Sequence, residues 1–134
     1  MSREPFDSWE KIPQKAINSY DIDGVIYMGK YDGLRPGPDD IIITGRSICT
    51  KDETKKMLLK KGITNPLYMN EKREDYNNRE QSGFHKGWTL FHLEQLGYRI
   101  AIHYDDDKIQ IEKINEMMPH IHCVHVKHEL VPKE

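Results

Sequence analysis

Short runs of β-branched residues alternate with amphipathic segments along most of the chain. Five stretches have the composition of strands, at residues 16–22, 39–47, 66–69, 98–104 and 121–126. Apolar side chains recur at helical spacing in three further segments, residues 51–61, 86–96 and 108–118. Because strands and helices take turns, the pattern predicts an α/β fold: a three-layer, doubly wound (Rossmann-like) parallel sheet of about five strands.

Three stretches stand outside this alternation. Residues 1–15 are polar and hold two prolines, which predicts an irregular lead-in that Phe6 and Trp9 pack onto the body. Residues 24–35 combine a short apolar run with glycines and predict a hairpin or flap. Residues 71–83 show no periodicity, so they predict a polar loop long enough to suggest function or disorder.

Length, composition, net charge and cysteine count narrow the class of protein. A length of 134 residues favours a single domain, 1–134, and 37% hydrophobic against 31% charged residues predicts a small core. A net charge of −2 is not the overall basic footprint of a nucleic-acid-binding protein, although it leaves room for a local basic patch. Two cysteines, Cys49 and Cys123, are too few for a disulfide framework and suggest a reducing compartment.

Membrane and export signals are not found in the sequence. No apolar run approaches the roughly 20 residues of a membrane span, and residues 1–15 lack the apolar core of a signal peptide. We therefore expect a cytoplasmic protein without a membrane partner. The sequence does not indicate the oligomeric state.

Two aspartates lie one residue apart where the first predicted strand meets a glycine turn. If the chain stays extended, Asp21 and Asp23 point at one spot; if it leaves the strand at Asp23, as Gly24 suggests, they converge around a bound ion from a strand end and a turn. In both geometries two carboxylates lie close together, which is unfavourable without a cation or a shared proton. The pair is a candidate metal or catalytic site.

Other predicted strands also end in polar groups. Thr44, Gly45 and Arg46 end the second strand, Asp105 and Asp106 end the fourth, and Lys86 opens the helix before the fourth. Ligands of open α/β sheets bind beyond the carboxyl ends of the strands, where these side chains would meet. Carboxylates suit Mg²⁺, and a hydroxyl with a lysine suits phosphate oxygens, so the set indicates magnesium-assisted phosphoryl chemistry.

Four segments resemble, in order, the motifs of the haloacid dehalogenase (HAD) superfamily of phosphohydrolases. DIDGV resembles motif one, IIITGRS motif two with Thr44 in its Ser/Thr position, HKGWTLFHLEQLG motif three with Lys86, and IAIHYDDD motif four. They span residues 16–107. The chain departs from the family pattern at Val25, where a threonine is usual, and at Asp107, a third aspartate in motif four.

The resemblance implies a role for each acid. Asp21 would be the nucleophile that forms an aspartyl-phosphate, and Asp23 would protonate the leaving oxygen and later activate water. Mg²⁺ would be held by Asp21, by the backbone carbonyl of Asp23, and by one of Asp105 or Asp106. We favour Asp106, because the second acid of the pair matches the metal-binding acid of the family.

The same resemblance implies how the phosphoryl group is bound. Thr44 and Lys86 would hold its oxygens and offset the charge that develops at transfer, with Gly45 and Arg46 beside them. About twenty residues separate Asp23 from Thr44, and about forty separate Thr44 from Lys86. The first gap fits a flap and the second is used by predicted elements, so the enzyme would have no cap domain.

An open site suits bulky substrates such as nucleic-acid ends. The stretch LYMNEKREDYNNREQSGFHK, followed by YDDD, is similar to the phosphatase domains of polynucleotide kinase-phosphatases, which remove 3′-phosphates. Arg46 matches an arginine in that group's motif two. Lys72, Arg73 and Arg79 are candidates for contacts to a nucleic-acid backbone. Two alternatives stay open: a phosphatase of small molecules such as a nucleotide or sugar phosphate, and a non-catalytic relative that binds a phosphorylated ligand.

Each residue also has a plainer interpretation. The acids can be solvated strand ends, Lys86 a surface lysine, and Arg46 the partner of a nearby acid. Asp105–Asp107 can begin a helix, a role that fits Asp107. The histidine-rich segment His120–His128 suggests zinc, but strand alternation places His122 and His125 on opposite faces, which favours incidental histidines.

Overall fold

Five parallel strands form the central sheet of the protein. A computed structural model describes residues 3–73 and 78–132. The strands lie in the order β5-β4-β1-β6-β7, and every neighbouring pair is parallel. Their bounds are β1 Ile17–Tyr20, β4 Ile41–Ser47, β5 Leu67–Asn70, β6 Ile100–Asp105 and β7 His122–His125. The predicted α/β architecture with a five-stranded parallel sheet is confirmed.

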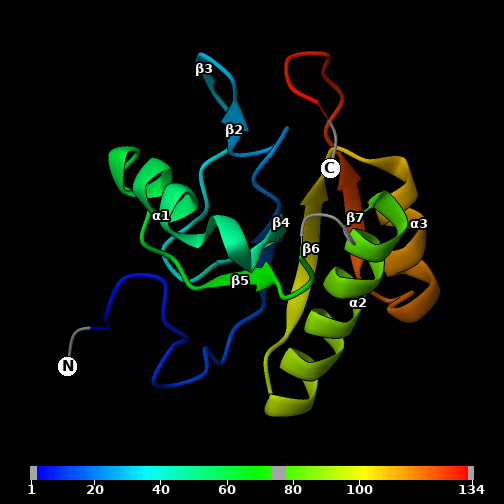
Figure 1. Cartoon of the computed structure of the whole chain (residues 1–134). Helices are drawn as coiled ribbons and strands as arrows, with labels where there is room; N and C mark the ends of the chain where they lie inside the picture. Colours follow the sequence, from blue (N-terminus) through cyan, green and yellow to red (C-terminus); the bar gives the residue numbers. More distant parts are fainter. Residues whose placement is uncertain (1–2, 74–77, 133–134) are drawn as a thin grey trace.

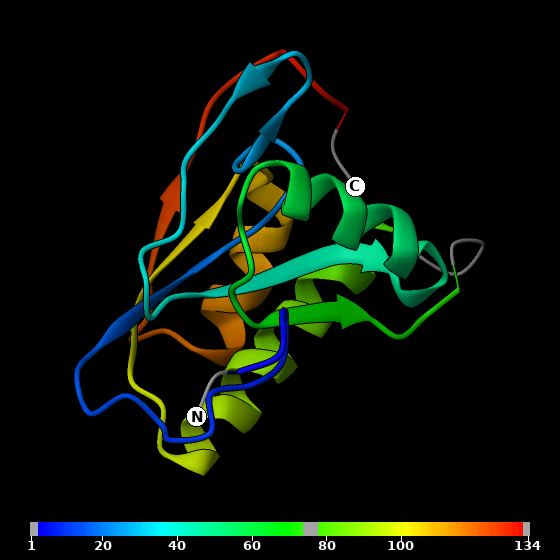
Figure 2. The ribbon, with the colours of Figure 1, turned by 90° about the vertical axis from the view of Figure 1, so that its left-hand side faces the viewer.

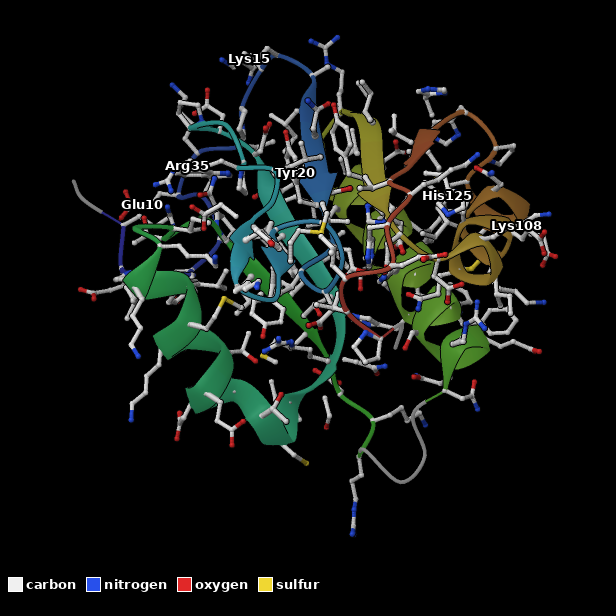
Figure 3. The ribbon with its side chains drawn as sticks, turned by 90° about the horizontal axis from the view of Figure 1, so that it is seen from above. Glu10, Lys15, Tyr20, Arg35, Lys108 and His125 are labelled. Atoms are coloured by element: carbon white, nitrogen blue, oxygen red, sulfur yellow. The ribbon has the colours of Figure 1, made fainter. Side chains whose placement is uncertain are left out.

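Helices cover both faces of this sheet (Figures 1 and 3). α1 (Lys51–Lys60) lies on one face, and α2 (Arg79–Leu96) and α3 (Lys108–Met117) lie on the other. The strand β4 shows why two layers form: Ile41 and Ile43 pack with Leu90 of α2, whereas Ile42 packs with Leu58 of α1. Alternate side chains of a strand point to opposite faces, so its continuous apolar run needs cover on both.

Two of the segments predicted to lie outside the sheet, 24–35 and the lead-in, have the expected form. β2 (Tyr27–Met28) and β3 (Tyr31–Asp32) pair as an antiparallel hairpin inside the predicted flap 24–35. The described part of the lead-in, 3–15, contains no helix or strand. Phe6 belongs to the apolar cluster under α1, and the indole of Trp9 donates to the carbonyl of Asp39 at 3.2 Å. The lead-in is therefore irregular but packed.

The start of α2 corrects the predicted loop at 71–83. The helix begins at Arg79, with Asn78 as its N-cap, so Lys86 lies in mid-helix and does not open it. Its first turns bury Ser82, Gly83 and Gly87 against β4 and α3, and a Cβ on Gly83 would lie 2.7 Å from the Cβ of Lys113. Small residues allow α2 to approach β4 and α3 closely. Because they are not large apolar side chains, the sequence shows no helical period of apolar residues there. Residues 74–77 of the predicted loop lie outside the described residues.

The order of the strands creates the place for a site. From β1 the chain moves outward to β4 and β5, then returns to the other side of β1 with β6 and β7. A crevice forms where the direction of winding reverses, next to the carboxyl end of β1. Figures 1 and 2 show the β2–β3 hairpin and the segment after β7 above this end of the sheet. In the described part of the chain, no helix combines the length and apolarity of a membrane span.

Candidate active site

Three buried carboxylates meet at the reversal point. Asp21 follows β1, Asp105 ends β6, and Asp106 comes next; all three are at most 5% exposed. β1 and β6 are neighbours, and the backbone N–H of Asp21 donates to the carbonyl of Tyr104 at 3.0 Å. One carboxylate oxygen from each aspartate lies within 4.8 Å of the others. We call these three residues the acidic cluster.

Lys86 reaches the acidic cluster from α2. Its side chain is fully buried, and its Nζ lies 3.1 Å from Asp21 Oδ2 and 2.7 Å from Asp105 Oδ2. It also donates to the side-chain carbonyl of Gln110 in α3. Burial alone would lower the pKa of Lys86, but the carboxylates of Asp105 and Asp21 outweigh it and hold the pKa above its ordinary value. Lys86 is therefore a permanent cation inside the site.

The charges of the acidic cluster do not balance. Burial raises the pKa of Asp21 well above its ordinary value; Lys86 opposes this shift, and the charges of Asp105, Asp23 and Asp106 add to it. Three carboxylates outnumber the one lysine ammonium, and His128 also lies against Asp106. A hard divalent cation with oxygen ligands would supply the missing charge. The donor set therefore fits Mg²⁺.

Asp23 is not one of the three clustered carboxylates and pairs with Arg46. The strand ends at Tyr20, and a tight turn follows in which Ile26 N donates to Ile22 O at 2.9 Å. The carboxylate of Asp23 accepts two hydrogen bonds from the guanidinium of Arg46, each 2.8 Å long. Asp21 thus contacts Lys86, whereas Asp23 contacts Arg46. The interpretation of Arg46 as the partner of a nearby acid is also borne out.

The end of β4 brings the motif-two residues beside Asp23. Thr44 is fully buried, and its Oγ1 accepts from the backbone N–H of Arg46 at 3.0 Å. Gly45 is required by packing, because a Cβ there would lie 2.7 Å from Ser82 Oγ. Thr44 and Arg46 therefore lie with Asp23 at the carboxyl edge of the sheet.

A buried chain of hydrogen bonds connects Ser19 and His103 to the carboxylate of Asp105. Ser19 Oγ lies 2.7 Å from His103 Nδ1, and His103 Nε2 lies 2.9 Å from Asp105 Oδ2. Burial lowers the pKa of His103, which favours a neutral ring that donates from Nε2 and accepts from the Ser19 hydroxyl at Nδ1. This role of His103 cannot be predicted from the sequence, because a histidine inside an apolar strand gives no signal of its own.

Two histidines of the C-terminal segment contact the acidic cluster. His128 Nε2 lies 2.8 Å from Asp106 Oδ2, and His125 Nε2 lies 3.1 Å from the Asp106 carbonyl. The backbone N–H of Leu130 donates to His128 Nδ1, so the ring proton lies on Nε2 and faces the carboxylate. These two histidines are not incidental. In the sequence, only the spacing His125-x-x-His128 could have indicated these contacts. Strand alternation does not predict them, because His128 lies beyond the strand β7.

Gly24 is the reason the segment can close so tightly. Its φ is +81°, and an added Cβ would lie 2.1 Å from Asp106 Oδ2 and 2.2 Å from His128 Nε2. Only glycine fits between the two side chains. Across the described residues, the acidic cluster is the only group of three or more potential metal ligands, so His120–His128 forms no zinc site there.

Asp107 has the structural role that its position predicts. It is the N-cap of α3 and accepts from Ile109 N at 3.2 Å. The guanidinium of Arg79 also binds it, with Nε 2.8 Å from Oδ2. Burial would raise the pKa of Asp107, but Arg79 and Gln110 outweigh it and lower the pKa. Among the three basic residues proposed for backbone contacts, Arg79 thus ties α2 to α3.

Comparisons with known proteins give no relative: no protein-family model, no curated protein and no solved structure matches the chain.

Proposed function

We propose that the protein is a magnesium-dependent phosphomonoester hydrolase that acts through an aspartyl-phosphate on Asp21. One observation carries the proposal: three buried carboxylates lie beside one lysine, with an oxygen of each close enough to the others to hold a divalent cation. A site with that charge and oxygen donors suits phosphoryl transfer, in which positioning and charge stabilisation supply most of the catalysis.

The two adjacent acids are held by different partners. Asp105 accepts from Lys86 and His103 at Oδ2 and from the N–H of Asp107 at Oδ1, whereas Asp106 Oδ2 lies 2.8 Å from His128 Nε2. The resemblance to the haloacid dehalogenase motifs favours Asp106 as the direct ligand, together with Asp21 and the backbone carbonyl of Asp23. When bound, Mg²⁺ would neutralise the phosphoryl oxygens and align the phosphorus for attack.

The chain's own residues would then carry the two half-reactions. A carboxylate oxygen of Asp21 attacks phosphorus, the bond to the ester oxygen breaks, and Asp23 protonates that oxygen. Asp23 next takes a proton from the water that attacks the aspartyl-phosphate, which releases phosphate and frees Asp21. Thr44 and Lys86 bind the phosphoryl oxygens, and Arg46 orients Asp23 through its paired hydrogen bonds.

A substrate panel tests this proposal. We expect the wild type with Mg²⁺ to hydrolyse an aryl phosphate and an oligonucleotide 3′-phosphate, and chelation to stop both reactions. Asp21→Asn should lower turnover at least about a thousandfold, because the amide cannot attack phosphorus. Asp52→Asn, an exposed aspartate of α1, is the matched control and should keep wild-type turnover.

The outcomes separate the three functions. Turnover of both esters supports nucleic-acid 3′-phosphate ends as the substrate class. Turnover of aryl phosphate alone would favour a small-molecule phosphatase. Phosphate binding without turnover of any ester would favour a non-catalytic relative, and undiminished turnover in Asp21→Asn would refute the aspartyl-phosphate.

A further inference from the structure

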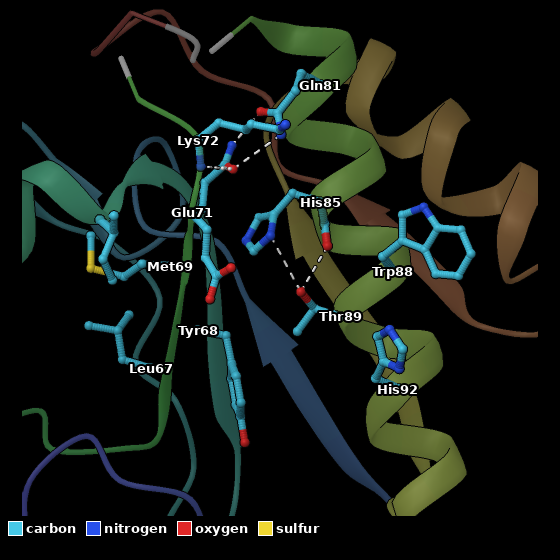
Figure 4. A pocket seen from close by; sticks show the side chains of 12 residues that line it. Leu67, Tyr68, Met69, Glu71, Lys72, Gln81, His85, Trp88, Thr89 and His92 are labelled. Atoms are coloured by element: carbon cyan, nitrogen blue, oxygen red, sulfur yellow. Dashed lines mark hydrogen bonds between the residues drawn. The ribbon is translucent and has the colours of Figure 1, made fainter. Parts of the chain in front are cut away.

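A groove runs between the edge strand β5 and the helix α2 (Figure 4). It has a volume of about 510 Å³. Its lining includes the rings and polar groups of Tyr68, Asn70, Lys72, His85, Trp88 and His92, beside apolar side chains such as Leu67 and Met69 and the carboxylate of Glu71. Tyr68 also packs against the apolar cluster between the sheet and α2, but packing of the fold does not account for Trp88 and His92, which are exposed.

The groove lies beside the candidate active site, with which it shares strand and helix neighbours. Ser47, at the end of β4, donates to the carbonyl of Lys72 at 2.7 Å, and Asn70 Nδ2 lies 3.5 Å from the carbonyl of Gly45. Strand β5 is two positions from β1 in the sheet, which places it about 10 Å from the strand that carries Asp21. On α2, His85 lines the groove while the next residue, Lys86, binds Asp21.

The rings in the groove offer flat apolar surface next to water. Trp88 is 53% exposed, although it is one of the largest apolar side chains in the protein. Its ring lies 5.9 Å from that of His92, and the two planes differ by 28°. Exposed, nearly parallel rings on one helix are suited to stacking with a planar heterocycle.

Polar groups in the groove add a means of orienting such a ligand. The Nε2 of His85 is buried and makes no hydrogen bond within residues 3–73 and 78–132. Burial and the charge of Lys86 lower the pKa of His85 to about 4, so the ring is neutral, and its Nδ1 lies 3.4 Å from Thr89 Oγ1. Lys72, at the end nearest the phosphoryl site, supplies positive charge for a backbone phosphate.

We propose that this groove binds the terminal bases of a single nucleic-acid strand whose 3′-phosphate enters the acidic cluster. The inference rests on the proposed function and names its substrate class. Trp88 and His92 stack on a base, and Lys72 contacts the phosphate between the terminal nucleotides. Stacking accepts every base, so binding should show little sequence preference.

Tryptophan fluorescence reports on the groove directly. The chain has two tryptophans, so Trp9→Phe leaves Trp88 as the sole emitter. In a Trp9→Phe/Asp21→Asn protein, which retains its ligand, a short 3′-phosphorylated oligothymidylate should quench Trp88. The same strand with abasic terminal nucleotides should bind more weakly and should not quench. Inorganic phosphate alone should leave the emission unchanged.

Substitution tests whether the ring contributes affinity. With a labelled strand and anisotropy, Trp88→Ala should raise Kd about 5- to 150-fold, the range expected for loss of one base–aromatic stack. Trp88→Phe should recover part of that loss. Phe84→Ala removes an exposed aromatic of the same helix that contacts Lys113 instead, and should leave Kd unchanged.

Equal affinity for the intact and abasic strands would overturn the inference, as would a Kd that Trp88→Ala does not change. Tighter quenching by a phosphopeptide than by the oligonucleotide would also overturn it and assign the groove to protein substrates. Hydrolysis of an aryl phosphate by the wild type, measured separately, tests the proposed function. A failure of base recognition is therefore distinct from a failure of catalysis.

Discussion

Asp105 and Asp106 are adjacent in sequence but differ in their surroundings. The carboxylate of Asp105 is bound by Lys86 and His103, and these partners outweigh burial and lower its pKa. Asp106 instead faces His128 and the turn at Gly24. Asp105 therefore holds the ammonium of Lys86 in place, whereas Asp106 lies beside the segment after β7. Neighbours from distant parts of the chain make this difference, which the run of three aspartates does not reveal.

At the same scale, His85 should make stability depend on pH. Burial and Lys86 lower the pKa of His85 to about 4, below the value of about 6.5 in an unfolded chain. Between these values the unfolded chain binds the extra proton, so acidification favours unfolding. The stabilising contribution is complete above about pH 6.5 and is lost as pH falls towards 4.

Urea unfolding at several pH values measures this effect. His85→Gln, which cannot titrate, should lose about 2–3 kcal/mol less than the wild type between pH 7 and 4.5. His92→Gln, at an exposed histidine two turns along the same face of α2, is the control and should follow the wild-type curve. Parallel curves for His85→Gln and the wild type would show that the imidazole is charged in the folded protein.

The segment after β7 is an element of the site. His128 donates to Asp106 from this segment, and Val131 lies beside Gly29 of the β2–β3 hairpin. Hydrogen bonds that orient a ligating carboxylate typically change metal affinity 10- to 100-fold. We expect His128→Ala to weaken Mg²⁺ binding about tenfold, because Asp106 loses the donor that holds it.

Calorimetric titration with Mg²⁺ distinguishes orientation from competition. If His128 instead competes with the cation for Asp106, His128→Ala would bind Mg²⁺ more tightly than the wild type. His120→Ala is the matched control, since His120 contacts the distant Glu94 on α2. Its Mg²⁺ affinity should equal that of the wild type.

Elements with an apolar period could be predicted from the sequence, and elements packed through small residues could not. The run Ile41–Ile43 predicts a strand covered on both faces, and the structure has that strand. α2 escaped prediction over its first turns because its buried face there is Ser82 and Gly83. The contact of His128 with Asp106 could not be predicted, because it depends on where the segment after β7 folds back over the sheet. No local sequence pattern encodes the path of that segment.

At the scale of the whole molecule, strand order converts sequence motifs into a site. The alternation of strands and helices predicts a parallel sheet, and parallel sheets collect the carboxyl ends of their strands at one edge. Asp21 and Asp105 are thus predictable as neighbours once β1 and β6 are known to pair. Their pairing is a property of the whole sheet, as is the contact of Asp23 with Arg46 of β4.

The acidic cluster joins β1 to β6, so its occupancy should control the stability of the entire sheet. Like charges held together at a functional site oppose folding until a cation binds. Mg²⁺ at a hundred times its dissociation constant should raise the free energy of unfolding by about 2.7 kcal/mol, and chelation should reverse it. Thermal unfolding with and without Mg²⁺ measures this gain.

Asp106→Asn separates charge repulsion from metal binding in the same measurement. The amide oxygen can still accept from His128, so the fold keeps that contact while one buried negative charge is removed. Without Mg²⁺ the variant should unfold at a higher temperature than the wild type, because its free energy of unfolding should be about 1 kcal/mol larger. With Mg²⁺ it should gain little. A variant that is less stable than the metal-free wild type would show that repulsion in the acidic cluster is already relieved by the protein's own groups. A variant that responds fully to Mg²⁺ would show that Asp106 does not bind the cation.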